Sequence, residues 1–521
     1  MYLVTPVEED QMIAASARCR RRPHWEAFSC PIASLCFRSE QVNMKYTLGA
    51  ALILQSTIAL GDLLPVQLRA PTTEHFRDIV RNDTYDFGCR PIAHPTEDGN
   101  FTLHALLTED QIEHLTKEYA SVDEITIHRQ MVKRAAAAPI GTGDRFAAGT
   151  ISPVGLGTQA SGATISSMMN VNEINSAFNA LVKNYGMGSV TLPYKTVGGA
   201  TSYAGFVGAG TDKSAYRLYL SAGVHARERG GPDQLIYWIS DLLAANKAGT
   251  GLTYGKKTYT NAQVKSVLAA GIVFFPLVNP DGVKYDQSSG SLWRKNRNTQ
   301  SGTSGSSIGV DLNRNFDFLW NFRKYFAASE APASTSPSSE TFYGTAAASE
   351  AETKNHVSIY DSFPKIRWFM DIHSAAGDLL YSWGDDDSQT TTSTMNFLNA
   401  AYDGKRGVTG DTAYKEYIPA ADNTNIKNVA AKTVAAMKAV GGRSYVAIPA
   451  VGLYATSGAS DDYAFSRYWA KPGANKVYGY TMEFGYSTNF YPTLSEFNQN
   501  ILDTNAGFMD WALGAISVGL N

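Results

Sequence analysis

Apolar residues in the second two thirds of the chain follow two alternating patterns. Some runs are short and almost continuously apolar, which is typical of buried strands. Other stretches repeat apolar residues at helical spacing. Strands that alternate with helices predict an α/β domain whose sheet is covered by helices on both faces. The expected strands cover 217–224, 271–278, 366–372 and 476–484, and the expected helices cover 170–186, 233–247, 347–360, 425–440 and 493–515.

Two helix starts carry a further signal. Thr493 and Glu496 have the spacing of a capping box, in which each side chain bonds the backbone N–H of the other residue. Thr108 and Gln111 have the same spacing. We therefore expect helices to begin directly after Thr108 and Thr493.

The first 61 residues differ in pattern from the rest. Residues 1–43 hold three of the four cysteines and show no periodicity, and we interpret them as a gene-model extension, with translation starting at Met44. Residues 44–61 join one lysine to a short apolar core and small residues, which is typical of a secretory signal peptide. The alternatives are an internal apolar helix and an uncleaved anchor, for which the apolar run is short.

Residues 62–134 form a separate polar segment. A helical pattern from Thr108 followed by a strand-like run indicates a small α+β unit. Sequons at Asn82 and Asn100 agree with secretion and predict N-glycosylation. The segment ends in the dibasic pair Lys133-Arg134, which is a candidate cleavage site for a kexin-like protease.

Composition limits what the remainder can do. Residues 135–168 are rich in Gly, Ala, Ser and Thr and indicate a linker, and the main domain is assigned to 169–521. This domain contains no cysteine, which excludes a thiolate nucleophile and a zinc finger. The net charge is −3 without a basic stripe, so we expect no nucleic-acid partner.

Three candidate metal ligands stand at strand ends. His225 closes the expected strand 217–224, Glu228 follows three residues later, and His373 closes another strand. For a single strand-end histidine, a buried and hydrogen-bonded side chain is the simpler interpretation. Two such histidines with a glutamate match the three-ligand pattern of catalytic zinc. The third histidine of the domain, His356, lies in a polar helix and is interpreted as a surface residue.

Further ionisable residues lie within apolar runs. Glu483 interrupts an apolar strand, where a carboxylate is costly without a task or partner. The stretches WRKNR at 293–297 and VDLNRNFD at 310–317 alternate charged with apolar residues, so we expect them to be half-buried.

Seven motifs stand in one order: HARE, NPDG, WRKNR, DLNRN, DIHS, LYATSG and TMEFG. In this order the chain resembles the zinc carboxypeptidases of the carboxypeptidase A/B family over 169–521. The resemblance implies one α/β domain with a mixed, twisted, mostly eight-stranded sheet, and one Zn²⁺ ion. It also implies a secreted metallocarboxypeptidase that cleaves the C-terminal bond of peptides and proteins, and a zymogen with 62–134 as its pro-segment.

The resemblance also implies roles for single residues. Zinc would be bound by His225, Glu228 and His373, with Asp311 accepting a hydrogen bond from the far nitrogen of His225. Glu483 would be the general base and then the proton donor. Arg294 would stabilise the oxyanion. The substrate's terminal carboxylate would be held by Asn313, Arg314 and Tyr454, in a groove lined by Arg227.

Asp461 decides the expected specificity. It stands seven residues after Tyr454, where the resemblance places the base of the side-chain pocket, and a carboxylate there favours C-terminal Lys or Arg. Broad or A-type specificity for apolar and aromatic residues is the alternative. A carboxypeptidase-like binding protein without catalysis, and a relative acting on another C-terminal amide, are further alternatives.

Two departures from the digestive enzymes of the family are evident. Ser291 replaces an arginine, and Ala375 replaces an aromatic residue of the outer subsite. The run Asp385-Asp386-Asp387 suggests either a calcium site or a solvated loop, and we favour the loop. We expect a monomer that is secreted, or alternatively vacuolar, with peptide C-termini as substrates, a kexin-like activating protease and no membrane partner.

Overall fold

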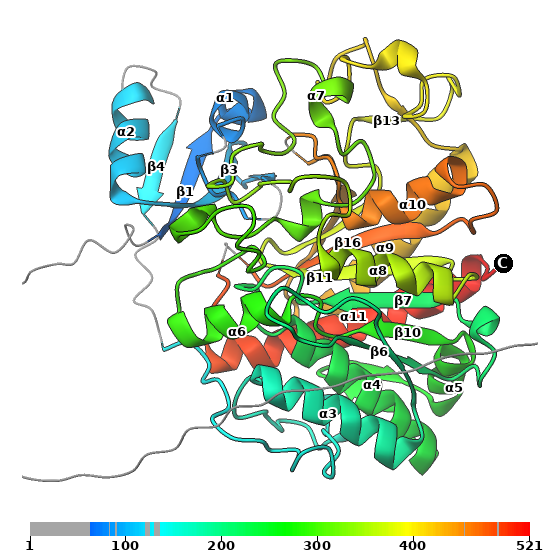
Figure 1. Cartoon of the computed structure of the whole chain (residues 1–521). Helices are drawn as coiled ribbons and strands as arrows, with labels where there is room; N and C mark the ends of the chain where they lie inside the picture. Colours follow the sequence, from blue (N-terminus) through cyan, green and yellow to red (C-terminus); the bar gives the residue numbers. More distant parts are fainter. Residues whose placement is uncertain are drawn as a thin grey trace, which may run out of the picture. The chain divides into compact units, whose positions relative to one another are not determined.

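One sheet organises the larger part of the chain (Figure 1). The computed structural model describes residues 63–82, 84–88, 91–119, 125–129, 136–452, 454–486 and 489–521. Within these ranges, eight strands hydrogen-bond in the order β15-β12-β16-β11-β7-β10-β6-β5. Their bounds are β5 Gly188–Thr191, β6 Tyr203–Val207, β7 Leu218–Ala222, β10 Ile272–Phe275, β11 Trp368–Ser374, β12 Asp378–Tyr381, β15 Val446–Pro449 and β16 Tyr478–Phe484.

The sheet is mixed, as predicted. Its centre is parallel, because β11 runs parallel to both β7 and β16, and β10 runs parallel to β7. Strand β12 is antiparallel to β16, and β6 is antiparallel to β10. The carboxyl ends of β7, β11 and β16 therefore meet at one edge of the sheet, where ligands bind in open α/β sheets.

Both faces of the sheet are covered by helices. In β7, Leu218 and Leu220 join the apolar core beneath α3, α4 and α11, whereas Tyr219 joins a second core beneath α8 and α10. Fully burying one leucine side chain stabilises the fold by about 1.5–3 kcal/mol. The helices are α3 Val171–Tyr185, α4 Gly231–Ala248, α5 Asn261–Ala269, α6 Pro280–Ser289, α7 Phe322–Tyr325, α8 Ala351–Ser362, α9 Ala420–Gly441, α10 Ser460–Ala470 and α11 Leu494–Val518.

The elements expected from the apolar patterns are present. Each predicted strand and helix overlaps an observed one, with bounds that differ by a few residues. The predicted capping box at the start of α11 is confirmed, because the Thr493 hydroxyl accepts from Glu496 N–H while the Glu496 carboxylate accepts from Thr493 N–H.

The N-terminal segment is a small α+β unit, as predicted. In its described residues, four antiparallel strands pair in the order β2-β3-β1-β4. Its capping box is also confirmed, because the Gln111 backbone N–H donates to the Thr108 hydroxyl and the Thr108 N–H donates to the Gln111 side chain. The elements are β1 Leu64–Ala70, α1 Arg77–Val80, β2 Ala93–Pro95, β3 Phe101–Leu107, α2 Glu109–Tyr119 and β4 Thr126–Arg129.

The stretch predicted as a linker is packed where the structure describes it. Leu156 and Ile165 are buried in the same apolar core as α3 and α4. The Gly157 N–H donates to Asp241 at 2.8 Å, and the Ile165 N–H donates to Asn498 at 2.6 Å. Gly and Ala are small enough to lie flat against the core, so composition alone did not distinguish this segment from a free linker.

Two surface predictions are wrong. His356 is completely buried, because it lies between the rings of Tyr219, Phe316 and Phe369. The acidic run is not a solvated loop, because Asp385 and Asp386 are also buried.

Residues 1–43, the predicted signal peptide 44–61 and the candidate cleavage site Lys133-Arg134 lie outside the described residues. Of the helices that are described, none is both long and apolar enough to span a membrane.

Candidate metal centre

The candidate ligands are delivered by strand ends and one turn. After β7 the chain turns at Gly223, whose φ of 72° favours glycine, and reaches His225 and Glu228 before α4 begins. His373 lies within β11, the neighbouring strand. The parallel arrangement of β7 and β11 thus carries all three side chains to the same edge of the sheet.

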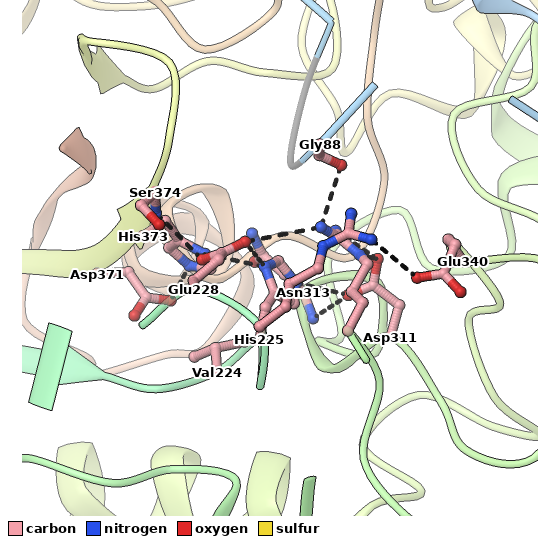
Figure 2. A network of polar contacts seen from close by, with 12 residues as sticks. Gly88, Val224, His225, Glu228, Asp311, Asn313, Glu340, Asp371, His373 and Ser374 are labelled. Carbon is pink, nitrogen blue, oxygen red and sulfur yellow. Dashed lines mark hydrogen bonds and ion pairs between the residues drawn. The ribbon is translucent and has the colours of Figure 1, made fainter. Parts of the chain in front are cut away.

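The three ligand groups converge in a buried cluster (Figure 2). The Glu228 carboxylate lies 2.7 Å from His225 Nδ1 through Oε1 and 2.9 Å from His373 Nδ1 through Oε2. The two Nδ1 atoms are 3.1 Å apart. Each residue is buried, and one ligand atom of each lies within 4.8 Å of the others. This is a site of the size that a single ion occupies.

The far nitrogens of both rings face carboxylates. Nε2 of His225 lies 3.0 Å from Asp311 Oδ1, and Nε2 of His373 lies 3.1 Å from Asp371 Oδ2. A proton on each Nε2 leaves the lone pair on Nδ1, which points into the cluster. Two lone pairs and a carboxylate then face one another, and a cation is the group that such a set of acceptors fits. Two histidines and one glutamate form the donor set of catalytic zinc sites with an open position.

The carboxylates of this cluster are held in the charged form. Burial opposes ionisation of Glu228, but the imidazoles of His225 and His373 hold the pKa of its carboxyl well below its ordinary value. Burial likewise opposes ionisation of Asp371, but the nearby His373 lowers its pKa to about 2.

Asp311 joins the metal ligands to the neighbouring arginine. Besides His225, its carboxylate accepts from Arg294 Nη2 at 2.8 Å and from the Asn313 backbone N–H at 2.9 Å. Burial raises the pKa of Asp311, but Arg294 and His225 together bring it well below its ordinary value. Arg294 Nη1 also lies 3.8 Å from Glu228 Oε1. The guanidinium is thereby fixed beside the ligand cluster.

Glu483 lies on β16, the strand that pairs with the strand carrying His373. In the pairing of β11 with β16 it stands beside His373, and it is 2% exposed. An ionisable group at this depth adjoins the ligand cluster without being one of its three members.

Asn313 and Arg314 follow Asp311 in the chain. The Asn313 side chain accepts from the Ser460 N–H at 2.8 Å. Arg314 is buried, with Nε donating to the Pro332 carbonyl at 3.1 Å and Nη1 donating to the Asn313 carbonyl at 2.9 Å. Arg314 Nη1 also lies 4.0 Å from Asp311 Oδ2, so the guanidinium is held close to the aspartate that contacts His225.

Asp461 is buried in the first turn of α10. One of its oxygens accepts from the Thr481 hydroxyl at 3.1 Å, and the other accepts from the Asp462 N–H at 3.0 Å. Asp462 itself accepts from the Gly384 N–H at 3.0 Å. Asp461, which the resemblance places at the base of the side-chain pocket, is therefore in direct contact with Thr481 of β16.

The N-terminal segment reaches two arginines of the site, Arg227 and Arg294. Arg227 Nη2 donates to Asp86 Oδ1 at 2.7 Å, and Arg227 Nη1 bonds the other oxygen of the same carboxylate. Arg294 Nη1 donates to the carbonyl oxygen of Gly88 at 3.1 Å (Figure 2). Arg227 also stacks on the ring of Phe490, with 4.5 Å from the guanidinium carbon to the ring centre.

The same segment contacts other expected substrate residues. Tyr454 packs against the apolar core of the segment. Leu106 shares an apolar cluster with Ala375, and Ile92 shares one with Leu380. Residues of the N-terminal segment thus cover residues of the main domain that the resemblance assigns to the substrate.

Sequence reasoning missed two residues of the site. Asp371 interrupts an apolar strand two residues before His373, which is the signal that identified Glu483, and it could have been found in the same way. Asp86 could not have been found from the sequence, because it lies 141 residues from Arg227 and in a different part of the fold.

Comparisons with known proteins agree with this geometry. The profile of the zinc carboxypeptidase family matches residues 194–507. Rat carboxypeptidase A2 is 31% identical over 261 residues, which are 49% of each chain, and bovine carboxypeptidase B is 28% identical over 266 residues, 50% of each. The chain thus spans about half the length of the relatives that it matches.

Solved structures show the same fold. Thrombin activatable fibrinolysis inhibitor matches with a TM-score of 0.58 at 19% identity, over 88% of this chain and 99% of the other. Carboxypeptidase A from Helicoverpa armigera matches with a TM-score of 0.59 at 17% identity, over 87% of this chain and 98% of the other.

The carboxylate behind His373 is expected to strengthen metal binding. Asp371→Asn keeps the shape of the side chain but removes its charge, so zinc affinity should fall about 10–100-fold. Zinc content after dialysis against graded chelator measures this effect. Asp317→Asn, which changes an exposed aspartate of the nearby DLNRNFD stretch, is the control. Equal zinc retention by both variants would contradict the role given to Asp371.

Proposed function

The chain belongs to the zinc carboxypeptidase family, and from this membership we propose that it is a secreted, zinc-dependent exopeptidase that hydrolyses the C-terminal peptide bond of peptides and proteins. One observation supports the proposal above all others. His225, Glu228 and His373 converge beside an oriented arginine and a buried glutamate at the end of three strands. Each group that such a hydrolysis requires is therefore available in one place.

Zinc and the general base would have different tasks in the first step of the hydrolysis. Bound zinc supplies a Lewis acid that polarises the scissile carbonyl and makes water a nucleophile at neutral pH. Glu483 accepts the proton of the attacking water and then passes it to the leaving amino group. Its burial beside His373 supports this role, because a water-poor environment strengthens each charge–charge interaction.

Arg294 stabilises the negative charge that develops on the carbonyl oxygen. Asp311 fixes the guanidinium through two nitrogen atoms, so little reorganisation is needed during the reaction. The contact between Arg294 Nη1 and the Gly88 carbonyl supports this assignment, because a peptide oxygen already occupies the donor. A preorganised donor of this kind contributes about 3–4 kcal/mol to catalysis.

Recognition of a free C-terminus is assigned to Asn313, Arg314 and Tyr454, with Arg227 along the groove. Arg314 offers a planar fork to a carboxylate. The contact with Asp86 supports a carboxylate-binding role for Arg227, because the Asp86 carboxylate binds Arg227 through both oxygens. An internal peptide bond offers no carboxylate to such a clamp, which restricts cleavage to the chain end.

Basic specificity is assigned to Asp461. The carboxylate is buried next to Thr481, and its oxygens accept from the Thr481 hydroxyl and the Asp462 N–H. A buried carboxylate at the base of the side-chain pocket would pair with the positive charge of a Lys or Arg side chain. Broad or A-type specificity remains the alternative, in which Asp461 has only a structural role.

Latency is assigned to the N-terminal segment 62–134. Its contacts with Arg227, Arg294 and Ala375 support an inhibitory role, since they occupy the groove that a peptide would need. Cleavage at Lys133-Arg134 by a kexin-like protease would release the segment after secretion. The enzyme would then act as a monomer with one zinc ion.

Removing the base tests the mechanism. Glu483→Gln should lower kcat by at least about 100-fold, which is the lower end of what a general base contributes. Zinc content should not change, because Glu483 is not among the three ligands. Hydrolysis of a blocked dipeptide together with metal analysis measures both quantities. Near-normal turnover by the zinc-loaded variant would overturn the assignment of Glu483.

Exchanging the pocket charge tests specificity. With matched peptides ending in Arg, Leu or Phe, the wild type should prefer Arg. Asp461→Asn should lower the ratio of kcat/KM for Arg over Leu by about 10–100-fold, the range of one hydrogen bond to a charged group. The Leu peptide serves as the internal reference, and a wild-type preference for Phe would refute basic specificity.

Breaking the Asp86–Arg227 pair tests latency. In the full chain with Lys133→Gln and Arg134→Gln to prevent cleavage, Asp86→Ala should raise peptidase activity by at least about tenfold, since loss of the buried Asp86–Arg227 pair weakens docking of the segment. Asp78→Ala, whose side chain is 88% exposed, is the matched control. Unchanged activity of the Asp86 variant would argue against inhibition through this contact.

A further inference from the structure

Asp378 is a buried carboxylate that the proposed mechanism leaves without a task. It is the first residue of β12, and its side chain is 0% exposed. Within the described part of the chain, neither of its oxygens has a hydrogen-bond partner. An ionisable group buried in this way costs free energy. A ligand that carries a positive charge would compensate for that cost.

The pairing of the strands brings Asp378 next to the base. In the antiparallel pair β12–β16, Asp378 lies directly opposite Glu483. Glu483 in turn stands beside His373 on β11. Directly opposed residues present their side chains on the same face of a sheet, with Cβ atoms about 4.5–5.5 Å apart. Asp378 thus flanks the base on the side away from the metal ligand.

The C-terminal side-chain pocket lies in a different row of the sheet. Thr481, which contacts Asp461, is paired with Leu380 rather than with Asp378. Asp378 and the proposed base Glu483 share one row of the sheet, and the proposed cleavage of the peptide bond takes place at this row. A substrate side chain that reaches Asp378 therefore belongs to a residue on the amino side of the scissile bond.

A residue of the N-terminal segment covers Asp378. His94 of β2 places Nε2 at 3.5 Å from Asp378 Oδ2, which is ion-pairing distance. Two residues earlier, Ile92 packs on Leu380, the next residue but one along β12. The His94 side chain is 25% exposed, whereas Asp378 is fully covered. Departure of the segment would open the carboxylate to the groove.

The surrounding charges leave this contact weak. Burial raises the pKa of Asp378 well above its ordinary value, and burial lowers the pKa of His94. Arg443 lies on the ring of Tyr486 nearby but pairs with Asp503 at 3.3 Å. His104 of the segment is a second imidazole close to His94, and burial lowers its pKa to about 4. His94 thus fills the place of a cation without supplying a permanent charge.

We propose that Asp378 is a cation-binding subsite of the mature enzyme, which takes a Lys or Arg side chain immediately before the scissile bond, and that His94 occupies it in the full chain. The subsite rests on the proposed exopeptidase function. Together with Asp461, it would favour peptides that end in two basic residues. Endoproteolysis after dibasic pairs is the class of reaction that produces such peptides.

Matched peptides test the subsite. The zinc-loaded protein is folded as the full chain and then cut between residues 120 and 135 by limited proteolysis. Two peptides differ only in the penultimate residue, Lys or Gln, and share the C-terminal residue that the enzyme cleaves best. The wild type should show a kcat/KM at least about tenfold higher for Lys, the effect of one charge-assisted hydrogen bond.

Variants assign that preference to one carboxylate. Asp378→Asn and Asp378→Leu should each reduce the Lys/Gln ratio to about one, whereas Asp361→Asn, an exposed control, should leave it unchanged. A wild-type ratio near one, or a ratio that survives both Asp378 substitutions, would overturn the subsite.

Failure of the parent proposal gives a different result. If the zinc-loaded wild type cleaves no peptide of the set, the exopeptidase function is wrong. Calorimetric binding of the same two peptides then decides the subsite. Tighter binding of the Lys peptide that Asp378→Asn removes would support it, and equal affinities would refute it.

Discussion

The orientation of two imidazole rings controls the chemistry of this site. Each ring has its far nitrogen against a buried carboxylate, Asp311 for His225 and Asp371 for His373. These contacts direct both Nδ1 atoms at the Glu228 carboxylate, inside a buried cluster. Since Asp311 also holds Arg294, one aspartate links the candidate metal ligands to the arginine to which we assign stabilisation of the developing charge. A rotation of either ring would move its Nδ1 atom away from Glu228 and its Nε2 atom away from the aspartate behind it.

The pairing of the strands sets the positions of the ionisable groups beside the candidate metal ligands. Parallel strands place His373 and Glu483 side by side, and an antiparallel neighbour adds Asp378 to the same row. The spacing between a metal ligand, a base and a further carboxylate is therefore set by backbone hydrogen bonds. Backbone spacing varies little, whereas loop positions vary more. The most distance-sensitive groups thus lie on the most rigid elements.

Much of this arrangement could be predicted from the sequence, because strand ends carry local signals. His225 and His373 close apolar runs, and Glu483 interrupts one, so these residues, which the structure brings together at one edge of the sheet, could be picked out from the sequence. His356 was misplaced at the surface because its helix is polar, while the aromatic rings that bury it come from distant segments. The Asp86–Arg227 pair left no trace in the sequence, since a contact between residues 141 positions apart depends on how two folded units meet.

The N-terminal segment presents a carboxylate to Arg227, a peptide carbonyl to Arg294 and an imidazole to Asp378. The substrate-binding residues and the residues of the segment that contact them therefore cannot change independently of each other. Under the proposed function, a substitution that adapts the groove to a new peptide would also alter the fit of the chain's own segment, and with it the proposed inhibition by that segment. Redesign of specificity in this protein would consequently need paired libraries, in which residues 86–94 vary together with the groove that they cover.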